Sequence, residues 1–254
     1  AVTSLDAGRF FKSERSSVIA LSEEEGTLGI SRMDARGRVT FPRLIDLAPG
    51  DPIVSGVVDL DRDGYDEIAV VFKSGGDFEL LLARPVDRAN FGIEWEILST
   101  TKLPDLRRAP IAMRELNIFG ERGPGLMLFI SREAPLLLAP VGADAAEYEL
   151  ELVGLNSGIR ESLLKGVSPG QVSEIDVDRD ELPELVVARE GYARVVRFSG
   201  DEFLMVDQYN TRRNDDSVAA VVPSFGPDGL EGLALYIADK GELQFLRREA
   251  DGVF

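Results

Sequence analysis

Two short acidic stretches contain the residues of this chain that could do chemistry. In the stretch at 59–67, carboxylates stand at positions 1, 3, 5 and 9 of a nine-residue loop, and the stretch at 176–184 repeats this spacing. Carboxylates at alternate positions can converge on one point, which is the oxygen ligand set of a hard cation such as Ca²⁺. The candidate ligands are the side chains of Asp59, Asp61, Asp63 and Glu67 in the first loop and of Asp176, Asp178, Asp180 and Glu184 in the second, with the backbone carbonyls of Tyr65 and Leu182 at position 7.

Position 6 distinguishes the two loops. A loop that wraps an ion needs a positive φ at this position, and Gly64 supplies it in the first loop. The second loop has Glu181 there, and a left-handed conformation at a non-glycine residue costs about 1–2 kcal/mol. Pro183 at position 8 is compatible with the turn before Glu184. The sequence therefore predicts one calcium ion in the first loop and admits a second, more weakly bound ion.

The flanking residues exclude an EF-hand. That loop needs a bidentate glutamate at position 12 and a helix on each side, whereas position 12 is Val70 in one loop and Val187 in the other. Both loops lead instead into β-branched runs that predict strands. An acidic loop between two strands resembles the calcium loop of the FG-GAP and VCBS repeats, which form the blades of integrin-α-like β-propellers.

The resemblance is strongest at 54–72 and 172–188. It implies that each loop closes the turn between the innermost and second strands of a blade, so that the ion has a structural role. The family commonly has aspartate at position 9, where this chain has Glu67 and Glu184, so that the denticity of these two ligands is left open.

Repeated strands predict the fold. Apolar β-branched and aliphatic runs begin at 18, 68, 126, 185 and 233, so that the repeat length lies between 48 and 59 residues. Repeats of roughly 40–50 residues with several short strands are typical of propeller blades. We predict an all-β fold, a single β-propeller domain over residues 1–254 built of four-stranded antiparallel blades, with five blades at about 1–49, 50–107, 108–165, 166–213 and 214–254.

The fifth blade has residues for only three strands, since its third strand at 242–247 is followed by few further residues. The resemblance implies seven blades. We therefore expect further blades of a longer propeller, or another polypeptide, to complete the ring, because unpaired sheet edges are normally protected.

Composition limits the partners and the chemistry. The net charge of −17 argues against nucleic acid and anionic membranes as partners, and no apolar run approaches the roughly 20 residues of a membrane span. Cysteine and histidine are absent, which removes thiol chemistry and the commonest general base.

These observations favour a calcium-stabilised, non-catalytic binding or scaffold module. It would recognise a protein or a carbohydrate, as in cell adhesion, and would be secreted, periplasmic or on the cell surface. Two alternatives stay open. One is a propeller-type enzyme that acts on polysaccharide through Asp, Glu, Tyr or Arg side chains, and the other is a structural subunit of a larger assembly.

Overall fold

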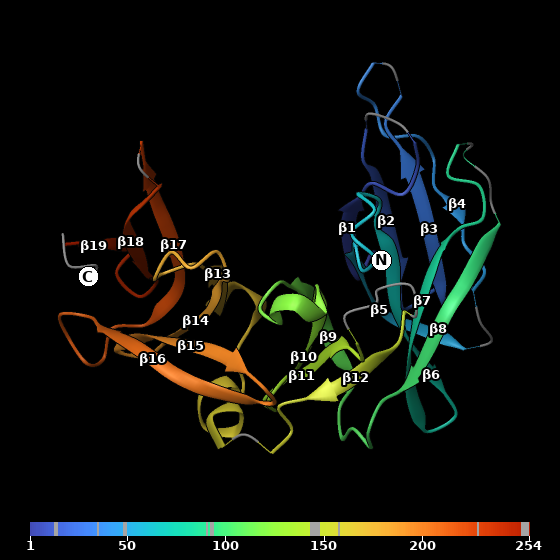
Figure 1. Ribbon diagram of the computed structural model, residues 1–254. Helices are drawn as coiled ribbons and strands as arrows, with labels where there is room; N and C mark the ends of the chain where they lie inside the picture. Colours follow the sequence, from blue (N-terminus) through green and yellow to red (C-terminus); the bar gives the residue numbers. More distant parts are fainter. Residues whose placement is uncertain are drawn as a thin grey trace. The chain divides into compact units, whose positions relative to one another are not determined.

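The computed structural model describes residues 1–12, 15–34, 36–47, 50–89, 91, 94–142, 148–156, 158–227, 229–249 and 254. These residues form an all-β structure of antiparallel sheets, in which strands that follow one another in the sequence are neighbours (Figure 1). Four sheets have four strands and one has three. The predicted all-β class with four-stranded antiparallel sheets is thus confirmed, and the arrangement of the sheets around an axis stays a prediction.

The chain divides into two compact units. The first comprises residues 1–116, 121–131 and 136–152. Its sheets contain β1 (Ser4–Gly8), β2 (Ser17–Ser22), β3 (Thr27–Arg32) and β4 (Arg43–Leu44); β5 (Asp51–Val58), β6 (Glu67–Ser74), β7 (Asp77–Pro85) and β8 (Trp95–Lys102); and β9 (Pro110–Leu116), β10 (Gly125–Ile130), β11 (Leu136–Pro140) and β12 (Leu150–Val153). The prediction of a single domain stays a prediction.

The second unit comprises residues 117–120, 132–135 and 153–254. Its sheets contain β13 (Val172–Ile175), β14 (Glu184–Arg189), β15 (Tyr192–Ser199) and β16 (Glu202–Asn210), and then β17 (Val218–Gly226), β18 (Gly229–Ile237) and β19 (Glu242–Arg247). The sequence also predicts a helical turn at 157–165, and a short π-helix runs over Arg160–Leu164. Its proposed N-cap, Ser157, lies outside the described residues. The sequence predicts a further strand at 93–97, whose first residue, Ile93, also lies outside the described residues.

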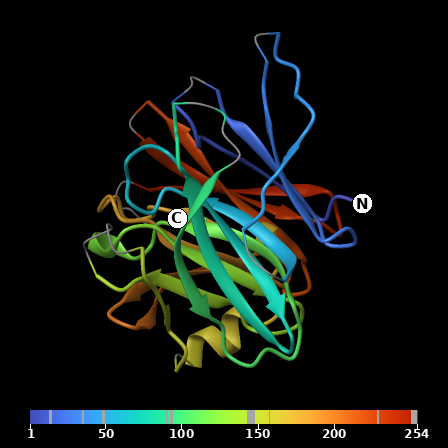
Figure 2. The same cartoon turned by 90° about the vertical axis from the view of Figure 1, so that its right-hand side faces the viewer.

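Strand β6 is apolar at successive positions, and alternate side chains of a strand point to opposite faces of the sheet. Ile68 and Val70 pack with Ile19 of the first sheet, in one cluster of buried side chains. Ala69 and Val71 pack in another cluster, which includes Leu126 and Leu128 of β10. The strand is therefore apolar on both faces because both faces are covered, and both views show β5 to β8 side by side as one twisted sheet (Figure 1, Figure 2).

The second unit repeats this design. Val186 and Ala188 of β14 pack with Leu233 and Leu235 of β18 in a shared cluster of buried side chains. Both acidic loops precede such a central strand, which fixes the end of each loop firmly in the core. No helix among the described residues is long and apolar enough to cross a membrane.

Candidate metal centres

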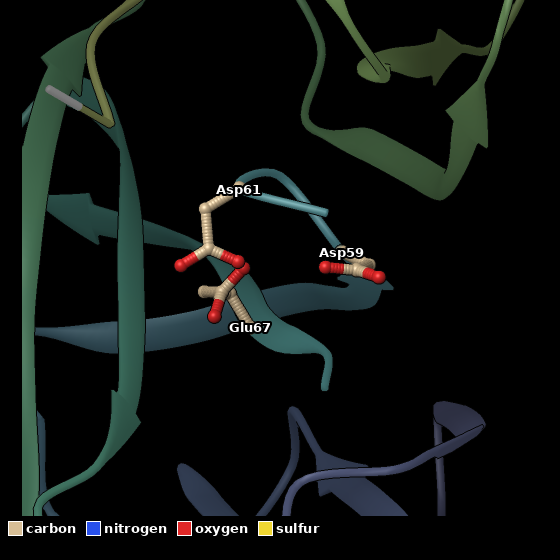
Figure 3. A group of neighbouring side chains, drawn as sticks. All are labelled: Asp59, Asp61 and Glu67. Carbon is tan, nitrogen blue, oxygen red and sulfur yellow. The ribbon is translucent and has the colours of Figure 1, made fainter. Parts of the chain in front are cut away.

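The first loop, between β5 and β6, brings three carboxylates together. One oxygen each of Asp59, Asp61 and Glu67 lies within 4.8 Å of the others, and Figure 3 shows Asp61 and Glu67 beside each other with Asp59 across the loop. The backbone of the loop is folded around these side chains. Gly64, with φ of 83° as predicted, donates its N–H to Asp59 Oδ2 at 3.0 Å, and the Tyr65 N–H donates to Asp63 Oδ1 at 2.8 Å.

The second loop, between β13 and β14, has the same construction. One oxygen each of Asp176, Asp178 and Glu184 lies within 4.8 Å of the others. Glu181 takes a positive φ of 74°, as predicted for position 6, and donates its N–H to Asp176 Oδ2 at 3.0 Å. The Leu182 N–H donates to Asp180 Oδ1 at 2.9 Å. A non-glycine residue therefore carries the strained conformation that Gly64 adopts freely.

The glutamate at position 9 is the most buried ligand of each loop. Glu67 and Glu184 both have no exposed surface. Each accepts a hydrogen bond from the N–H at position 2, so that Leu60 N lies 3.1 Å from Glu67 Oε2 and Val177 N lies 3.0 Å from Glu184 Oε2. A buried carboxylate needs a compensating positive charge. The contacts of the other oxygen of each glutamate, Oε1, show which group supplies that charge.

An arginine supplies that charge in each loop. Arg88, in the connection after β7, places Nη2 2.6 Å from Glu67 Oε1 and 3.8 Å from Asp63 Oδ2. Arg197 of β15 donates Nε at 3.0 Å and Nη2 at 2.5 Å to Glu184 Oε1, contacts Asp178, and lies 3.5 Å from Asp180 Oδ2. The second loop therefore has the more extensive guanidinium contact.

The first loop is also bonded to sequence-distant segments on two sides. Tyr148, which precedes β12, donates its hydroxyl to Asp61 Oδ2 and accepts a hydrogen bond at 2.8 Å from Arg84 Nη1. Asp66, which is not one of the predicted ligands, accepts the Arg9 N–H at 2.5 Å and donates its own N–H to the Arg9 carbonyl at 3.0 Å. These contacts fix the loop against the first and third sheets.

Burial changes the acidity of the site. Desolvation raises the pKa of Glu67 to about 7, although the hydrogen bonds from Leu60 and Arg88 oppose the rise, and desolvation likewise raises the pKa of Asp59. In the second loop, the hydrogen bonds to Glu184 and then to Asp178 raise the pKa of Arg197. Burial, followed by its hydrogen bond to Asp61, raises the pKa of the Tyr148 hydroxyl.

The first loop has a free acceptor for a cation. Asp59 Oδ1 is buried and accepts no hydrogen bond from any described residue, and Arg88 Nη1 is likewise buried without an acceptor. A buried polar atom without a partner is costly, and a cation bound at Asp59 would remove that cost. The donors are all oxygens, which fits Ca²⁺ or another hard cation and disfavours metals that prefer nitrogen or sulfur.

The structure thus brings six of the ten predicted ligands into two groups that could hold a metal ion. Asp63 and Asp180 stand at the rim of these groups, in contact with Arg88 and Arg197. Ligation by any of the ten, including the Tyr65 and Leu182 carbonyls, stays a prediction. Neither arginine is among the residues predicted from the sequence. Strand register could have indicated Arg197, because it directly follows Val196, the residue that pairs with Leu185 next to the second loop. No local sequence pattern predicts the contact of Arg88.

Comparisons with known proteins bear on the fold. No protein-family model matches the sequence, and no curated protein matches it. Among 244 matching chains of solved structures is the rhamnogalacturonan lyase YesW, with a TM-score of 0.57 and 15% sequence identity. The match covers 97% of this chain and 49% of the lyase, so that this chain spans about half the length of that enzyme. Such low identity shows the fold alone, and the resemblance to FG-GAP and VCBS repeats stays a prediction.

Proposed function

We propose that this chain is a non-catalytic recognition or scaffold module of β-propeller architecture, stabilised by Ca²⁺ in the first loop and, more weakly, in the second. The observation that carries the proposal is the repeated construction of the loops: the same turn, the same position-2 hydrogen bond and the same fully buried glutamate. The five consecutive antiparallel sheets of the described residues support the propeller, and a larger enzyme, the rhamnogalacturonan lyase, is similar in fold.

The ion would have a structural role because each ligand set comes from a single loop. Asp59, Asp61 and Glu67 would hold the cation of the first loop, and Asp176, Asp178 and Glu184 that of the second. The bound cation would neutralise carboxylates that otherwise repel one another, and it would join the last turn of one strand to the first residue of the next. On such a scaffold, the loops and sheet edges would contact the partner. The partner would be a protein or a glycan, and the module would lie outside the cytoplasm.

The test is calorimetric. Isothermal titration of chelator-treated protein with Ca²⁺ should show one tighter and one weaker site, and Mg²⁺ should bind more weakly. At free Ca²⁺ about 100-fold above the dissociation constant, each site should add about 2.7 kcal/mol to the free energy of unfolding, which is seen as a higher melting temperature. Absence of heat in millimolar Ca²⁺, with melting unchanged by excess chelator, would refute the proposal.

The similarity to a rhamnogalacturonan lyase supports an enzymatic alternative, a propeller that acts on polysaccharide. The acidic residues of the loops are engaged with arginines and backbone N–H groups, and histidine is absent from the sequence. A glycan array combined with a reducing-sugar assay separates the two functions. Binding without product supports recognition, whereas product formation that is lost on heat denaturation supports the enzyme.

A further inference from the structure

The two sheets that carry an acidic loop each place an arginine at the same point of the third strand. In the sheet of β5 to β8, the residue that pairs with Ile68, at position 10 of the first loop, is followed by Arg84. In the sheet of β13 to β16, the residue that pairs with Leu185, at position 10 of the second loop, is followed by Arg197. The two arginines are therefore equivalent in register, and their contacts can be compared directly.

The arginine of the second sheet touches its loop. Arg197 lies opposite Leu204 of β16, whose side chain offers no acceptor, and its guanidinium contacts Asp178, at position 3 of the loop. Arg84 instead lies opposite Glu96 of β8, with Nε 3.1 Å from Oε2. Both of these side chains are partly exposed, and an exposed ion pair is weak. Glu96 alone therefore does not explain why Arg84 stays away from the first loop.

A tyrosine hydroxyl stands between Arg84 and the first loop. Tyr148 accepts a hydrogen bond at 2.8 Å from Arg84 Nη1 and donates one to Oδ2 of Asp61, which is the position-3 residue of this loop. A tyrosine hydroxyl is uncharged at neutral pH, whereas a guanidinium group is always charged. The first loop therefore meets a neutral donor at the position where the second loop meets a cation.

Tyr148 is held in place by more than its hydroxyl. Its ring packs against the buried cluster that contains Val71 and Leu126, and the guanidinium of Arg84 lies over it, 5.5 Å from the ring centroid. Its backbone carbonyl accepts a hydrogen bond at 2.6 Å from Ser99 Oγ. Its φ is 49°, a conformation that is uncommon for a bulky residue and that persists where surrounding contacts impose it. Tyr148→Phe therefore removes the hydroxyl while the ring and backbone contacts remain.

The neutral contact leaves Asp61 able to bind a cation. Its Oδ2 accepts the Tyr148 hydroxyl and its Oδ1 accepts the Asp63 N–H at 3.1 Å, and a carboxylate has about four acceptor positions in all. The attraction between opposite charges falls with distance. An arginine that touches a carboxylate therefore competes with a metal ion more strongly than one that is separated from it by a hydroxyl group.

We propose that Tyr148 sets the cation affinity of the first loop by shielding Asp61 from Arg84. The hydroxyl occupies the place that a direct ion pair between these two side chains would take, whereas Asp178 of the second loop contacts its arginine directly. This inference rests on the proposed calcium binding. It adds an affinity-determining residue that lies outside the loop and comes from the segment before β12.

Calcium titration calorimetry of the whole chain tests the effect on affinity. Tyr148→Phe should weaken the tighter site at least fivefold, because Arg84 can then pair with Asp61. Adding Arg84→Gln to Tyr148→Phe should restore the affinity to within twofold of the wild type, since the competing charge is gone. The control is Tyr192→Phe, which removes the hydroxyl of a tyrosine that also packs under an arginine and should leave both sites unchanged.

A second measurement in excess chelator tests the shielding without the ion. A double-mutant cycle of Arg84→Gln and Asp61→Asn, followed by urea denaturation, gives the coupling between these two side chains. Expressed as a ratio of unfolding equilibrium constants, the coupling should be at least fivefold larger in the Tyr148→Phe chain than in the wild type. If Tyr148→Phe does not fold, Arg84→Gln alone still tests the shielding, because a shielded arginine should change the calcium affinity less than twofold.

The results that would overturn the role of Tyr148 differ from those that would overturn calcium binding. The role of Tyr148 fails if Tyr148→Phe leaves the calcium affinity unchanged, or if the coupling does not rise. It also fails if Arg84→Gln does not restore the affinity, which would mean that the hydroxyl only orients Asp61. A wild-type chain that binds no calcium refutes the calcium proposal and the affinity role together.

Discussion

The two acidic loops have a similar backbone turn, but they differ in how arginine side chains balance the charge of their carboxylates. In the first loop, Arg88 reaches Glu67 with one nitrogen and leaves Asp59 Oδ1 without a partner. In the second, Arg197 contacts Glu184, Asp178 and Asp180. Similar ligand spacings therefore do not give equivalent sites. We expect the first loop to need its cation more and the second to be more stable without one.

The comparison is tested most strongly by removing ligands in pairs. Asp59→Asn with Asp61→Asn should abolish the tighter calcium site and most of the stabilisation by Ca²⁺, about 2.7 kcal/mol at 100-fold excess over the dissociation constant. Asp176→Asn with Asp178→Asn should remove only the weaker site. Calcium titration and thermal melting of both variants check this. Equal losses from the two variants would show that the loops are equivalent.

The buried glutamates should respond differently in excess chelator. Glu184→Gln breaks a two-nitrogen contact with Arg197, whereas Glu67→Gln breaks a single contact with Arg88. Hydrogen bonds to charged groups contribute about 1.5–3 kcal/mol each, so we expect the greater loss of unfolding free energy from Glu184→Gln. Urea denaturation measures both losses, and a larger loss from Glu67→Gln would reverse our view of the first loop.

The arginines should compete with the cation. Arg197→Gln and Arg88→Gln remove a positive charge from the carboxylates, so calcium affinity should rise roughly tenfold or less, which corresponds to about 1.4 kcal/mol at most. The increase should be larger for Arg197→Gln because Arg197 touches three carboxylates. Titration calorimetry measures the affinities. A fall in affinity would mean that the guanidinium groups hold the ligands in place for the ion.

The smallest effect is expected at position 6. Glu181→Gly relieves a positive φ of 74° and should stabilise the protein by about 0.5–1 kcal/mol, with the greater flexibility of glycine in the unfolded chain offsetting part of the gain. Gly64→Glu is the reciprocal change and should destabilise by a similar amount. Differential scanning calorimetry in chelator compares the two. No change from either variant would show that strain does not distinguish the loops.

Local features of the site were predictable and remote ones were not. The spacing of the aspartates and the positive φ at Gly64 and Glu181 follow from the loop sequence, because one short segment determines them. The all-β class follows from the repeated apolar runs. The balancing cations depend on side chains from other strands, and register alone is insufficient: Arg84 occupies the place of Arg197 but bonds Glu96 and Tyr148 instead.

Two hydrogen bonds join Asp66 to Arg9, so that the first loop connects its own sheet to the segment that follows β1, in addition to providing the candidate metal ligands. With Tyr148 holding Asp61 from the other side, three sheets meet at one loop. A pulling force applied along the chain would have to shear these contacts before the second sheet could peel away from its neighbours. The mechanical strength of this half of the molecule should therefore be concentrated at a turn rather than spread along its strands.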